Sequence, residues 1–538
     1  MADSVRGDCV TGSAIAPFLF DDIAALPDWR ERLAWPISLS RLRVSAEAMC
    51  DEAIAAASEL TDALEHQVFV VACGRFVNAS MSLVEAGLVA QIEATAAVEP
   101  LGGPPEMDYL RGRAAAPHAL EDRRRGMGVL DVTPADWPLL RAFVRARSWS
   151  SPIALPRAVM WPDAVAVSHN SLLITRARRL RPSLGYRPAA NFVATARRGS
   201  TVTCPENLVE LARRVAPRLI ARFPELDEPF RARVTAAFAA RLEPALRRIG
   251  SDVLALRATR RLPKNLWRGT GGSYAGRVLS VEVLRRGGYV LGFDHGGDTG
   301  ISQLPQLTAM IELMVASEFC VGTDAQRRLL EDSEFPTIAR PVHAARIVAD
   351  QGEELFRRAS IDGRARPGAR RRVVYVGHPF RGLRQFAIVG TPDAIYWDLQ
   401  SRVAKALSGM AIDLVCKPHP EGALVGRRNP IEDFAPTSYR RFEEHLADTD
   451  VFVFDAPTST TFAEALCTDR PVVLIDRGHY PFNPRIANEM RARVRMVPSR
   501  VDERGRIWPD AAALEDAVLA GAATADPGYF RRLLAGDS

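Results

Sequence analysis

The sequence predicts an α/β protein made of two doubly wound domains that face each other across a cleft. Its 538 residues are too many for one hydrophobic core and enough for two domains. Short apolar runs alternate with helix-like segments in both halves, as in parallel sheets whose strands are connected by helices. Polar and glycine-rich motifs directly follow several of these runs, at the strand ends where such sheets bind their ligands.

The first half, residues 1–335, is predicted to be one α/β domain with a large helical insertion. Residues 67–72 are apolar, end in Cys73-Gly74 and precede a helix-like stretch over 80–95, which is typical of a βα unit. The other expected elements are strands at 164–168, 289–293 and 318–322, a long helical region over 206–249, and loops at 101–125 and 176–204, which are rich in Pro, Gly and Arg.

A linker is expected over residues 336–372, because they contain Pro341 and the run DGRARPGARRR. Residues 373–538 predict a second, Rossmann-type domain with closing C-terminal helices. Its expected strands begin with the run 372–380, which ends in a loop, and continue with 412–417, 451–455 and 471–476; its expected helices are 394–407, 439–446 and 460–466.

Composition narrows the classes of function. No run of eighteen or more apolar residues occurs, and the first residues lack the pattern of a secretory signal. The seven cysteines include no C-x-x-C pair, which indicates a reducing compartment. The net charge of +6 rests on arginine, with three lysines only, and is spread along the chain, which disfavours nucleic acid as a partner. We therefore expect a cytoplasmic protein whose charge allows peripheral association with the inner face of the cytoplasmic membrane.

The sharpest motif is Lys417-Pro418-His419-Pro420, at the end of the strand expected over 412–417. The two prolines fix the backbone around the histidine. A rigid loop that carries a lysine and a histidine suits a diphosphate or phosphodiester leaving group, because a nearby phosphate favours the protonated imidazole as a donor. The alternative is a surface turn in which His419 only ends the strand.

A second motif runs from Asp455 through four consecutive hydroxyl residues into the helix expected over 460–466. Hydroxyl groups and the unpaired N–H groups of a first helical turn form an anion site, which the helix dipole reinforces. The alternative is ordinary helix capping. The candidate phosphate ligands here are Thr458, Ser459, Thr460 and Thr461, with Glu464 one turn inside the helix.

The order of these motifs resembles the C-terminal nucleotide-binding domain of GT-B glycosyltransferases. KPHP, a strand, a hydroxyl cluster that opens a helix, EAL and PVVLID follow one another within residues 373–476. This order is most similar to that of bacterial enzymes with an HP motif and a serine/threonine motif: sialyltransferases, capsule Kdo transferases and the CDP-glycerol glycerophosphotransferases of teichoic acid synthesis. The resemblance implies that His419, Ser459 and Thr460 bind the phosphates of CMP or CDP, with Thr458 and Thr461 beside them. The DAPTS spacing is longer than the DYSS-like form of the teichoic acid enzymes.

A third motif, Asp294-His295-Gly296-Gly297, continues to Gly300 after the strand expected over 289–293. Glycine lets a substrate approach the backbone closely. The segment resembles the QHGG-x-x-G segment of surface-carbohydrate transferases, with Asp294 in place of glutamine. The resemblance places this histidine at the transfer centre, and it implies that His295, with Asp294, takes the proton of the acceptor hydroxyl. The alternative is a glycine-rich turn with an incidental histidine.

Further candidates follow other predicted strands. His378 and Arg381 end the run 372–380, where Arg381 could neutralise a phosphate or carboxylate of the donor. Asp448-Thr449-Asp450 spells D-x-D but enters a strand at the end away from the cleft, so we expect metal-independent chemistry without a cofactor. The acceptor-side candidates are Gly296, Gly297 and the GTGGS residues Gly271, Gly272 and Ser273, which are not a phosphate-binding P-loop because no G-K-[ST] ends them.

Together these observations predict a glycosyltransferase that moves a sugar from a CMP- or CDP-linked donor to a saccharide or lipid-linked saccharide acceptor, in the synthesis of capsule or another surface polysaccharide. Two alternatives from other classes stay open: an isomerase like the UDP-sugar 2-epimerases, and a catalytically inert partner in polysaccharide assembly. Binding of CMP, CDP, UDP or GDP distinguishes the three.

Overall fold

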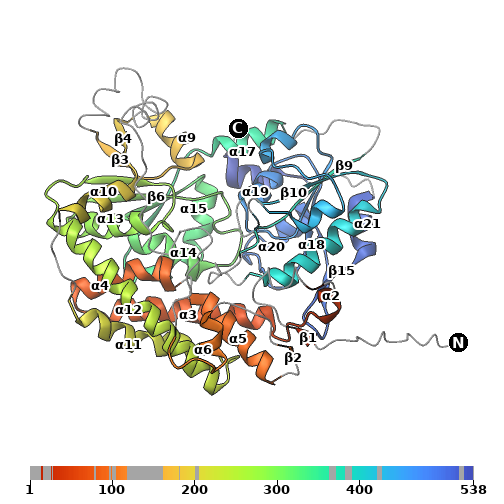
Figure 1. Ribbon diagram of the computed structural model, residues 1–538. Helices are drawn as coiled ribbons and strands as arrows, with labels where there is room; N and C mark the ends of the chain where they lie inside the picture. The colour runs from red at the N-terminus through yellow and green to blue at the C-terminus, as the bar shows by residue number, and fades with distance from the viewer. Residues whose placement is uncertain are drawn as a thin grey trace.

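The chain is an α/β protein with two parallel sheets among many helices (Figure 1). It is seen here in a computed structural model. The structure describes residues 28–77, 80–95, 105–117, 162–180, 182–199, 205–362, 371–381, 390–420, 427–519 and 526–536, together with residues 14–15, 26, 98–99 and 424.

The first sheet has six parallel strands in the order β4-β3-β5-β6-β7-β8. Its central strands β6 and β7 are apolar and almost wholly buried, as expected for strands covered by helices on both faces. Three of these strands confirm the predictions for 164–168, 289–293 and 318–322. The strands are β3 (Ala164–Ala166), β4 (Leu184–Tyr186), β5 (Asn265–Arg268), β6 (Tyr289–Phe293), β7 (Glu318–Val321) and β8 (Arg346–Ala349).

The second sheet has five parallel strands in the order β10-β9-β11-β12-β13. The order reverses between β9 and β11, which creates the crevice where doubly wound sheets bind ligands. The helix expected over 439–446 is only a 3₁₀ turn, Phe442–His445; the other expected strands and helices of this half are confirmed. The elements are β9 (Arg372–Val376), α18 (Asp393–Ser408), β10 (Asp413–Lys417), β11 (Val451–Phe454), α19 (Thr460–Leu466), β12 (Val472–Ile475), α20 (Ala487–Arg493) and β13 (Val494–Val497).

A layer of helices lies beneath the first sheet, at the lower left of Figure 1. The predicted helical region over 206–249 is confirmed as two helices that pack on each other, α11 and α12. The rest of the layer precedes the first sheet in the chain. Its members are α3 (Leu39–Glu59), α4 (Ala63–Ala72), α5 (Met81–Thr95), α6 (Pro105–Leu110), α11 (Asn207–Ile220) and α12 (Glu228–Ala258).

The prediction of a strand over 67–72 is wrong, because these residues are the second half of α4. Residues 67–72 are buried without exception, so the helix has no polar face over this stretch. A short run that is apolar on every side has no period that separates a strand from a buried helix. Asp62 begins the helix, because its side chain accepts from the N–H groups of Leu64 and Glu65.

The predicted loops are also wrong in part. Residues 176–204 contain the end of α9 (Ser171–Leu180), strand β4 and helix α10 (Ala189–Arg198). Strand β4 is three residues long, which is too short to show an alternating pattern. In α10 the side chains of Phe192, Val193 and Ala196 are buried, while Arg197 and Arg198 lie in its last turn. Residues 101–125 include α6; their remainder from 118 onward lies outside the described residues.

Part of the predicted linker belongs to the first sheet. Strand β8 pairs with β7 along its whole length and forms the edge of that sheet. Helix α17 (Glu354–Asp362) follows it. The Pro- and Arg-rich composition of residues 336–372 therefore hid a strand of four residues. Residues 363–370 lie outside the described part of the chain.

The end of the chain returns to the first half. After α21 (Ala511–Leu519) come α22 (Gly528–Phe530) and a π-helical turn, Arg531–Ala535, which packs on α17 and on α15 (Asp324–Glu331). The Thr323 hydroxyl donates to the carbonyl of Leu533 at 2.5 Å. The predicted closing C-terminal helices thus fasten the second half to the first. Within the described residues, no helix is both long and apolar enough to cross a bilayer.

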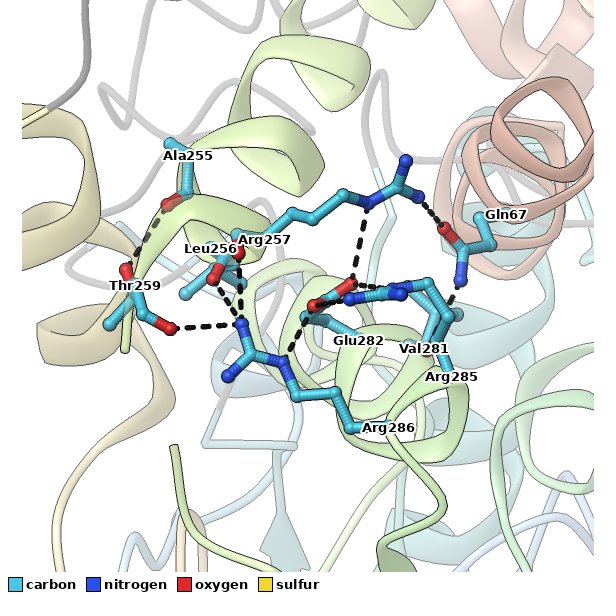
Figure 2. A network of polar contacts seen from close by, with 9 residues as sticks. All are labelled: Gln67, Ala255, Leu256, Arg257, Thr259, Val281, Glu282, Arg285 and Arg286. Atoms are coloured by element: carbon cyan, nitrogen blue, oxygen red, sulfur yellow. Dashed lines mark hydrogen bonds and ion pairs between the residues drawn. The ribbon is translucent and has the colours of Figure 1, made fainter. Parts of the chain in front are cut away.

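A buried carboxylate organises the packing of α12 against α13 (Tyr274–Arg285) (Figure 2). Glu282 accepts from Arg285 at 2.7 Å and from Arg286 at 2.8 Å, and Arg257 lies 3.9 Å away. Arg286 also donates to the carbonyls at the end of α12, including that of Leu256 at 2.9 Å. Burial acts to raise the pKa of Glu282, but its hydrogen bonds to the arginines hold that pKa below its usual value. The network therefore fixes the helix that supports β6.

Candidate functional site

The carboxyl ends of the two sheets are joined by a backbone contact. Residues 294–304, here the His-Gly-Gly loop, follow β6, and the loop after β12 runs beside them. Gln303 N–H donates to the carbonyl of Pro481 at 3.0 Å, and Asn483 N–H donates to that of Ile301 at 2.9 Å. Because ligands of doubly wound sheets bind beyond the carboxyl ends of strands, motifs from both halves come together at the place where such sheets bind their ligands.

Asp294 anchors the His-Gly-Gly loop from within. The side chain is 2 % exposed. One carboxylate oxygen accepts from the Thr299 hydroxyl, and the other accepts from Gln326 Nε2 at 2.8 Å. Burial raises the pKa of Asp294. Asp294 thus holds the loop in place, because one oxygen is engaged within the loop and the other by α15.

Gly296 and Gly297 lie against protein, although we expected them to lie against substrate. Both have positive φ angles, +97° and +74°. A Cβ on Gly296 would collide with Oγ1 of Thr460, and one on Gly297 would collide with the ring of Phe356. These glycines let the loop from the first sheet touch the start of α19 in the second half.

A pocket of about 320 Å³ opens on the other side of this loop. We call it the β6 pocket. It collects three residues that the sequence predicted for the transfer centre or the acceptor side, Asp294, His295 and Gly272. Its other walls come from the loop after β5 and from α14 (Pro305–Ile311). The full lining is Gly74, Thr270, Gly272, Asp294, His295, Asp298, Thr299, Gly300, Ser302, Leu304, Leu307, Thr308, Ile311 and Glu312.

The wall of the β6 pocket is fixed by Arg277, a fully buried side chain that the sequence analysis missed. Its guanidinium donates to the carbonyls of Val70, Gly271 and Ile311, at 2.5, 3.3 and 2.6 Å. One side chain thus ties α4, the loop after β5 and α14 together. Gly271 lies behind the wall and not in it, because its N–H donates to Glu312 Oε1 at 2.9 Å. Ser273 caps α13 by accepting from Gly276 N–H.

Asp298 is the carboxylate of the pocket that sequence reasoning overlooked. It is half-buried, and burial together with the charge of Asp294 raises its pKa to about 7. His295, by contrast, is exposed at the pocket. The D-x-x-x-D spacing of Asp294 and Asp298 was visible in the sequence, but only the fold reveals that the first is engaged in the loop and the second lies in the pocket.

The second sheet presents a group of positive and imidazole side chains, here the basic cluster: His378, Arg381, His419, Arg477 and His479. They follow β9, β10 and β12. Arg381 lies 3.0 Å from Nε2 of His378. Burial, and then the charges of Arg381, Arg477, His419 and His479, hold the pKa of His378 well below its usual value. The structure thus brings together three predicted donor-binding residues, His378, Arg381 and His419.

Arg477 is, with His479, one of the two members of the basic cluster that were not predicted from the sequence. It follows β12 directly, is 5 % exposed and lies near the rings of Tyr396 and Tyr480. One nitrogen donates to the Thr391 hydroxyl at 2.9 Å. The other two, Nε and NH2, have no hydrogen-bond partner among the described residues although they are buried. A buried guanidinium with unused donors is costly unless an anion completes it.

Asp455, whose charge acts on Arg477, makes no hydrogen bond to it among the described contacts. Asp455 directly follows β11, the strand between β9 and β12. Its oxygens accept from the hydroxyls of Tyr375 at 2.6 Å and Tyr396 at 2.9 Å. Tyr396 also accepts from the N–H of His378. The tyrosines therefore hold the base of the crevice rigid and leave the basic cluster above it with a net positive charge.

The hydroxyl motif serves in part as a helix cap, the alternative noted above. Ser459 accepts from the N–H of Phe462 at 3.2 Å, and its oxygen lies 3.0 Å from that of Thr461. Thr460 contacts the His-Gly-Gly loop through Gly296. Thr458 Oγ1 is buried without a partner among the described residues. Thr458 is thus the hydroxyl with capacity for a ligand, in the loop between β11 and α19.

Lys417 and Glu464 lie beneath the surface. Lys417 is buried, and its ammonium donates to the carbonyl of Arg440 at 2.7 Å. Glu464 is 2 % exposed, and burial, with the charges of Glu443 and Glu353, raises its pKa well above the usual value. Both residues were predicted to bind the nucleotide-sugar donor, but their side chains are buried within the second half.

Metal ligands are not gathered in the described residues, where no group of three or more His, Cys, Asp or Glu side chains could hold an ion. Asp450 accepts from the N–H of Arg372, and Asp448 pairs with the same arginine at 3.4 Å. Both aspartates thus lie at the start of β9, at the end of the sheet opposite the basic cluster.

Comparison with known proteins finds no family model, no curated protein and no solved structure that matches the chain. The residues that meet where the carboxyl ends of the two sheets face each other are therefore the guide to its function.

Proposed function

We propose that the protein is a GT-B-type glycosyltransferase that moves a sugar from a CMP- or CDP-linked donor to a saccharide or lipid-linked saccharide during synthesis of capsule or another surface polysaccharide. One observation carries the proposal. The basic cluster contains a buried arginine with unused donors, lies at the carboxyl edge of a doubly wound sheet, and is followed in the chain by residues 481–483, which pair with the loop that lines a pocket of the other sheet.

The donor side is the basic cluster. A phosphate between β9 and β12 would accept from Nε and NH2 of Arg477, and its charge would favour protonation of the neighbouring imidazoles, His378 and His419. Thr458 adds a hydroxyl from the loop that follows β11, the strand between β9 and β12. Arginine suits this role because its planar fork matches two phosphate oxygens.

The acceptor side is the β6 pocket. Its volume of about 320 Å³ is at the lower end of the range for small-molecule sites, which suits one sugar unit. The loop that lines it pairs with residues 481–483, which continue from Arg477. Donor phosphate and acceptor hydroxyl would thus bind on adjoining segments.

The chemistry that follows is transfer of the sugar with departure of a phosphate. As the anomeric carbon–oxygen bond breaks, negative charge grows on the phosphate oxygen, and fixed positive groups stabilise that charge more than they stabilise the ground state. Arg477 and His419 are the residues to which we assign this stabilisation. Enclosure between the two halves would limit transfer to water.

Nucleotide binding tests the proposal. We expect CMP or CDP to raise the melting temperature of the full chain, since a ligand at about 100 times its Kd adds about 2.7 kcal/mol to the free energy of unfolding. Arg477→Gln should abolish the rise. Arg491→Gln, at an exposed arginine on α20 that donates to Asn488, is the matched control and should retain it.

The alternatives predict other outcomes. A rise with UDP alone, and turnover of a UDP-sugar without acceptor, would favour an epimerase-like isomerase. If none of CMP, CDP, UDP and GDP raises the melting temperature, the protein is not a nucleotide-dependent enzyme, and the inert assembly partner becomes the better hypothesis.

A further inference from the structure

We propose that Asp298, and not Asp294 or His295, is the base that takes the proton of the acceptor hydroxyl, and that this hydroxyl binds in the β6 pocket. The inference rests on the proposed function and names the catalytic residue and the acceptor subsite within it.

The bonding of the pocket carboxylates selects Asp298. Asp294 has both oxygens engaged, by Thr299 and Gln326. Glu312 uses Oε1 to accept from Gly271 N–H; its Oε2 has no hydrogen-bond partner among the described residues, but it is buried away from the pocket surface, 3.8 Å from Arg268. Neither oxygen of Asp298 has a hydrogen bond or an ion pair with another residue that the structure describes. Asp298 is therefore the carboxylate of the lining that can accept a hydrogen bond from a ligand.

The surroundings of Asp298 suit a base. The titratable groups that line the pocket with it are Asp294, His295 and Glu312. Burial and then Asp294 raise its pKa to about 7, so that near neutral pH it is partly ionised and can still hold a proton firmly. The loop that carries it is held on both sides, by Asp294 from within and by residues 481–483 from the second half. A rigid, half-buried carboxylate results.

The step is balanced as follows. The acceptor oxygen forms a bond to the anomeric carbon as its proton passes to a carboxylate oxygen of Asp298. The bond between the anomeric carbon and the phosphate oxygen breaks, and its electron pair leaves with the nucleotide. Water in the pocket can take the place of the acceptor, so Asp298 also controls slow hydrolysis of the donor.

Hydrolysis allows a test without a known acceptor. The full chain is incubated with CMP-N-acetylneuraminate, CDP-glycerol, UDP-glucose and GDP-mannose, and nucleotide release is followed as a function of pH. We expect Asp298→Asn to lower the rate of release about 100-fold or more, to leave the melting-temperature rise with CMP or CDP unchanged, and to remove the ionisation near pH 7 from the profile. Asp298→Glu should recover part of the rate.

Two variants serve as controls. Asp516→Asn, an exposed aspartate on α21 whose side chain is 76 % exposed, should release nucleotide at the wild-type rate. His295→Gln should lose less than tenfold, since an exposed histidine at the rim is not the base.

The outcomes separate the two proposals. If Asp298→Asn retains a third or more of the wild-type rate while CMP or CDP still raises its melting temperature, the base is another residue and the proposed function stands. If His295→Gln loses more activity than Asp298→Asn, the assignment is likewise overturned in favour of the histidine. If the wild-type chain binds no nucleotide and cleaves none of the four donors, the proposed function fails and the inference fails with it.

Discussion

Two buried arginines in the second half differ in their bonding. Arg493 donates to the carbonyls of Leu466, Ala465, Thr468 and Arg470, at distances of 2.8–3.0 Å. Arg477 donates to a single hydroxyl and leaves two nitrogens unused. Both are nearly inaccessible to solvent. The first arginine supports the fold, whereas the second is incomplete without an anion.

Methionine at each position measures this difference. Arg493→Met should lower the free energy of unfolding by about 2–5 kcal/mol, because it leaves buried carbonyls without donors. Arg477→Met should change it by no more than about 1 kcal/mol in the absence of ligand, because two of its three guanidinium nitrogens have no hydrogen bond within the described residues to lose. Denaturant unfolding of both variants checks the prediction. Equal losses would mean that Arg477 is a structural residue.

His479 makes stability depend on pH. Burial, and then the charge of Arg477, lower its pKa to about 3. The unfolded chain therefore binds a proton that the folded chain does not between about pH 6.5 and pH 3, and this residue costs stability as the pH falls through that window, by about 1.4 kcal/mol per unit. His479→Asn should make the curve of unfolding free energy against pH flatter between pH 6.5 and 4. An unchanged slope would contradict the assignment.

The sequence predicted which residues follow strands more reliably than it predicted what their side chains contact. Polar residues that directly follow apolar runs, such as His295, His378 and His419, lie at carboxyl ends of strands as predicted. Arg477 was missed because one arginine in an arginine-rich chain forms no pattern. Asp294 and Lys417 were expected to face a ligand. Their hydrogen-bond partners, Gln326 and the carbonyl of Arg440, lie elsewhere in the sequence and belong to no motif that would have revealed the contacts.

At the scale of elements, a helix or strand was predicted correctly where its pattern of apolar residues and the turn residues around it were clear. In the second half, strands of four or five residues lie between turn signals, and their positions were predicted. In the first half α4 is apolar on every side over residues 67–72, so its period was hidden. The short strands β4 and β8 are stabilised by pairing with β3 and β7, and their own residues show no strand-like alternation of apolar and polar side chains.

The packing of α13 on α12 depends on Glu282 (Figure 2). Glu282→Gln leaves Arg257, Arg285 and Arg286 without their carboxylate and should lower the free energy of unfolding by about 3–5 kcal/mol. Because the pKa of Glu282 is lowered in the folded chain, its stabilisation is present above about pH 4.5, its unfolded value, and is lost as the pH falls through its folded value. Chemical unfolding at pH 7 and pH 4 measures both effects.

A matched control for this variant is Glu228→Gln. Glu228 is exposed at the start of α12 and pairs with Arg231 at 3.1 Å. We expect a loss below about 1 kcal/mol, as for other surface ion pairs. Equal losses of unfolding free energy in the two variants would show that burial does not make the Glu282 network more stabilising than a surface ion pair.

At the scale of the whole molecule, several contacts among the described residues hold the two sheets in one arrangement. They include the backbone pairing of residues 301–303 with 481–483, the contact of Gly296 with Thr460, and the C-terminal turn on α15 and α17. The general architecture of two parallel sheets was predicted from alternating elements. Their contact was not, because it depends on backbone groups and on glycines that no pattern identifies.

Gly296→Ala tests this contact. The new Cβ would collide with Thr460 and would be strained at a φ of +97°, so we expect loss of nucleotide release together with a lower melting temperature. Gly287→Ala is the control, since its φ is +72° but nothing lies within 4 Å of a Cβ there; it pays the backbone strain alone. Adding Thr460→Ala should restore part of the activity of Gly296→Ala. Equal activity of Gly296→Ala and Gly287→Ala would show that the contact has no role.

The most direct test is a crystal structure of the full chain with CDP. We predict that the diphosphate lies between β9 and β12, with a phosphate oxygen within hydrogen-bond distance of Arg477 Nε or NH2 and another facing His419. A nucleotide bound elsewhere, with Nε and NH2 of Arg477 still without a hydrogen-bond partner, would contradict the claim that the basic cluster binds the leaving phosphate.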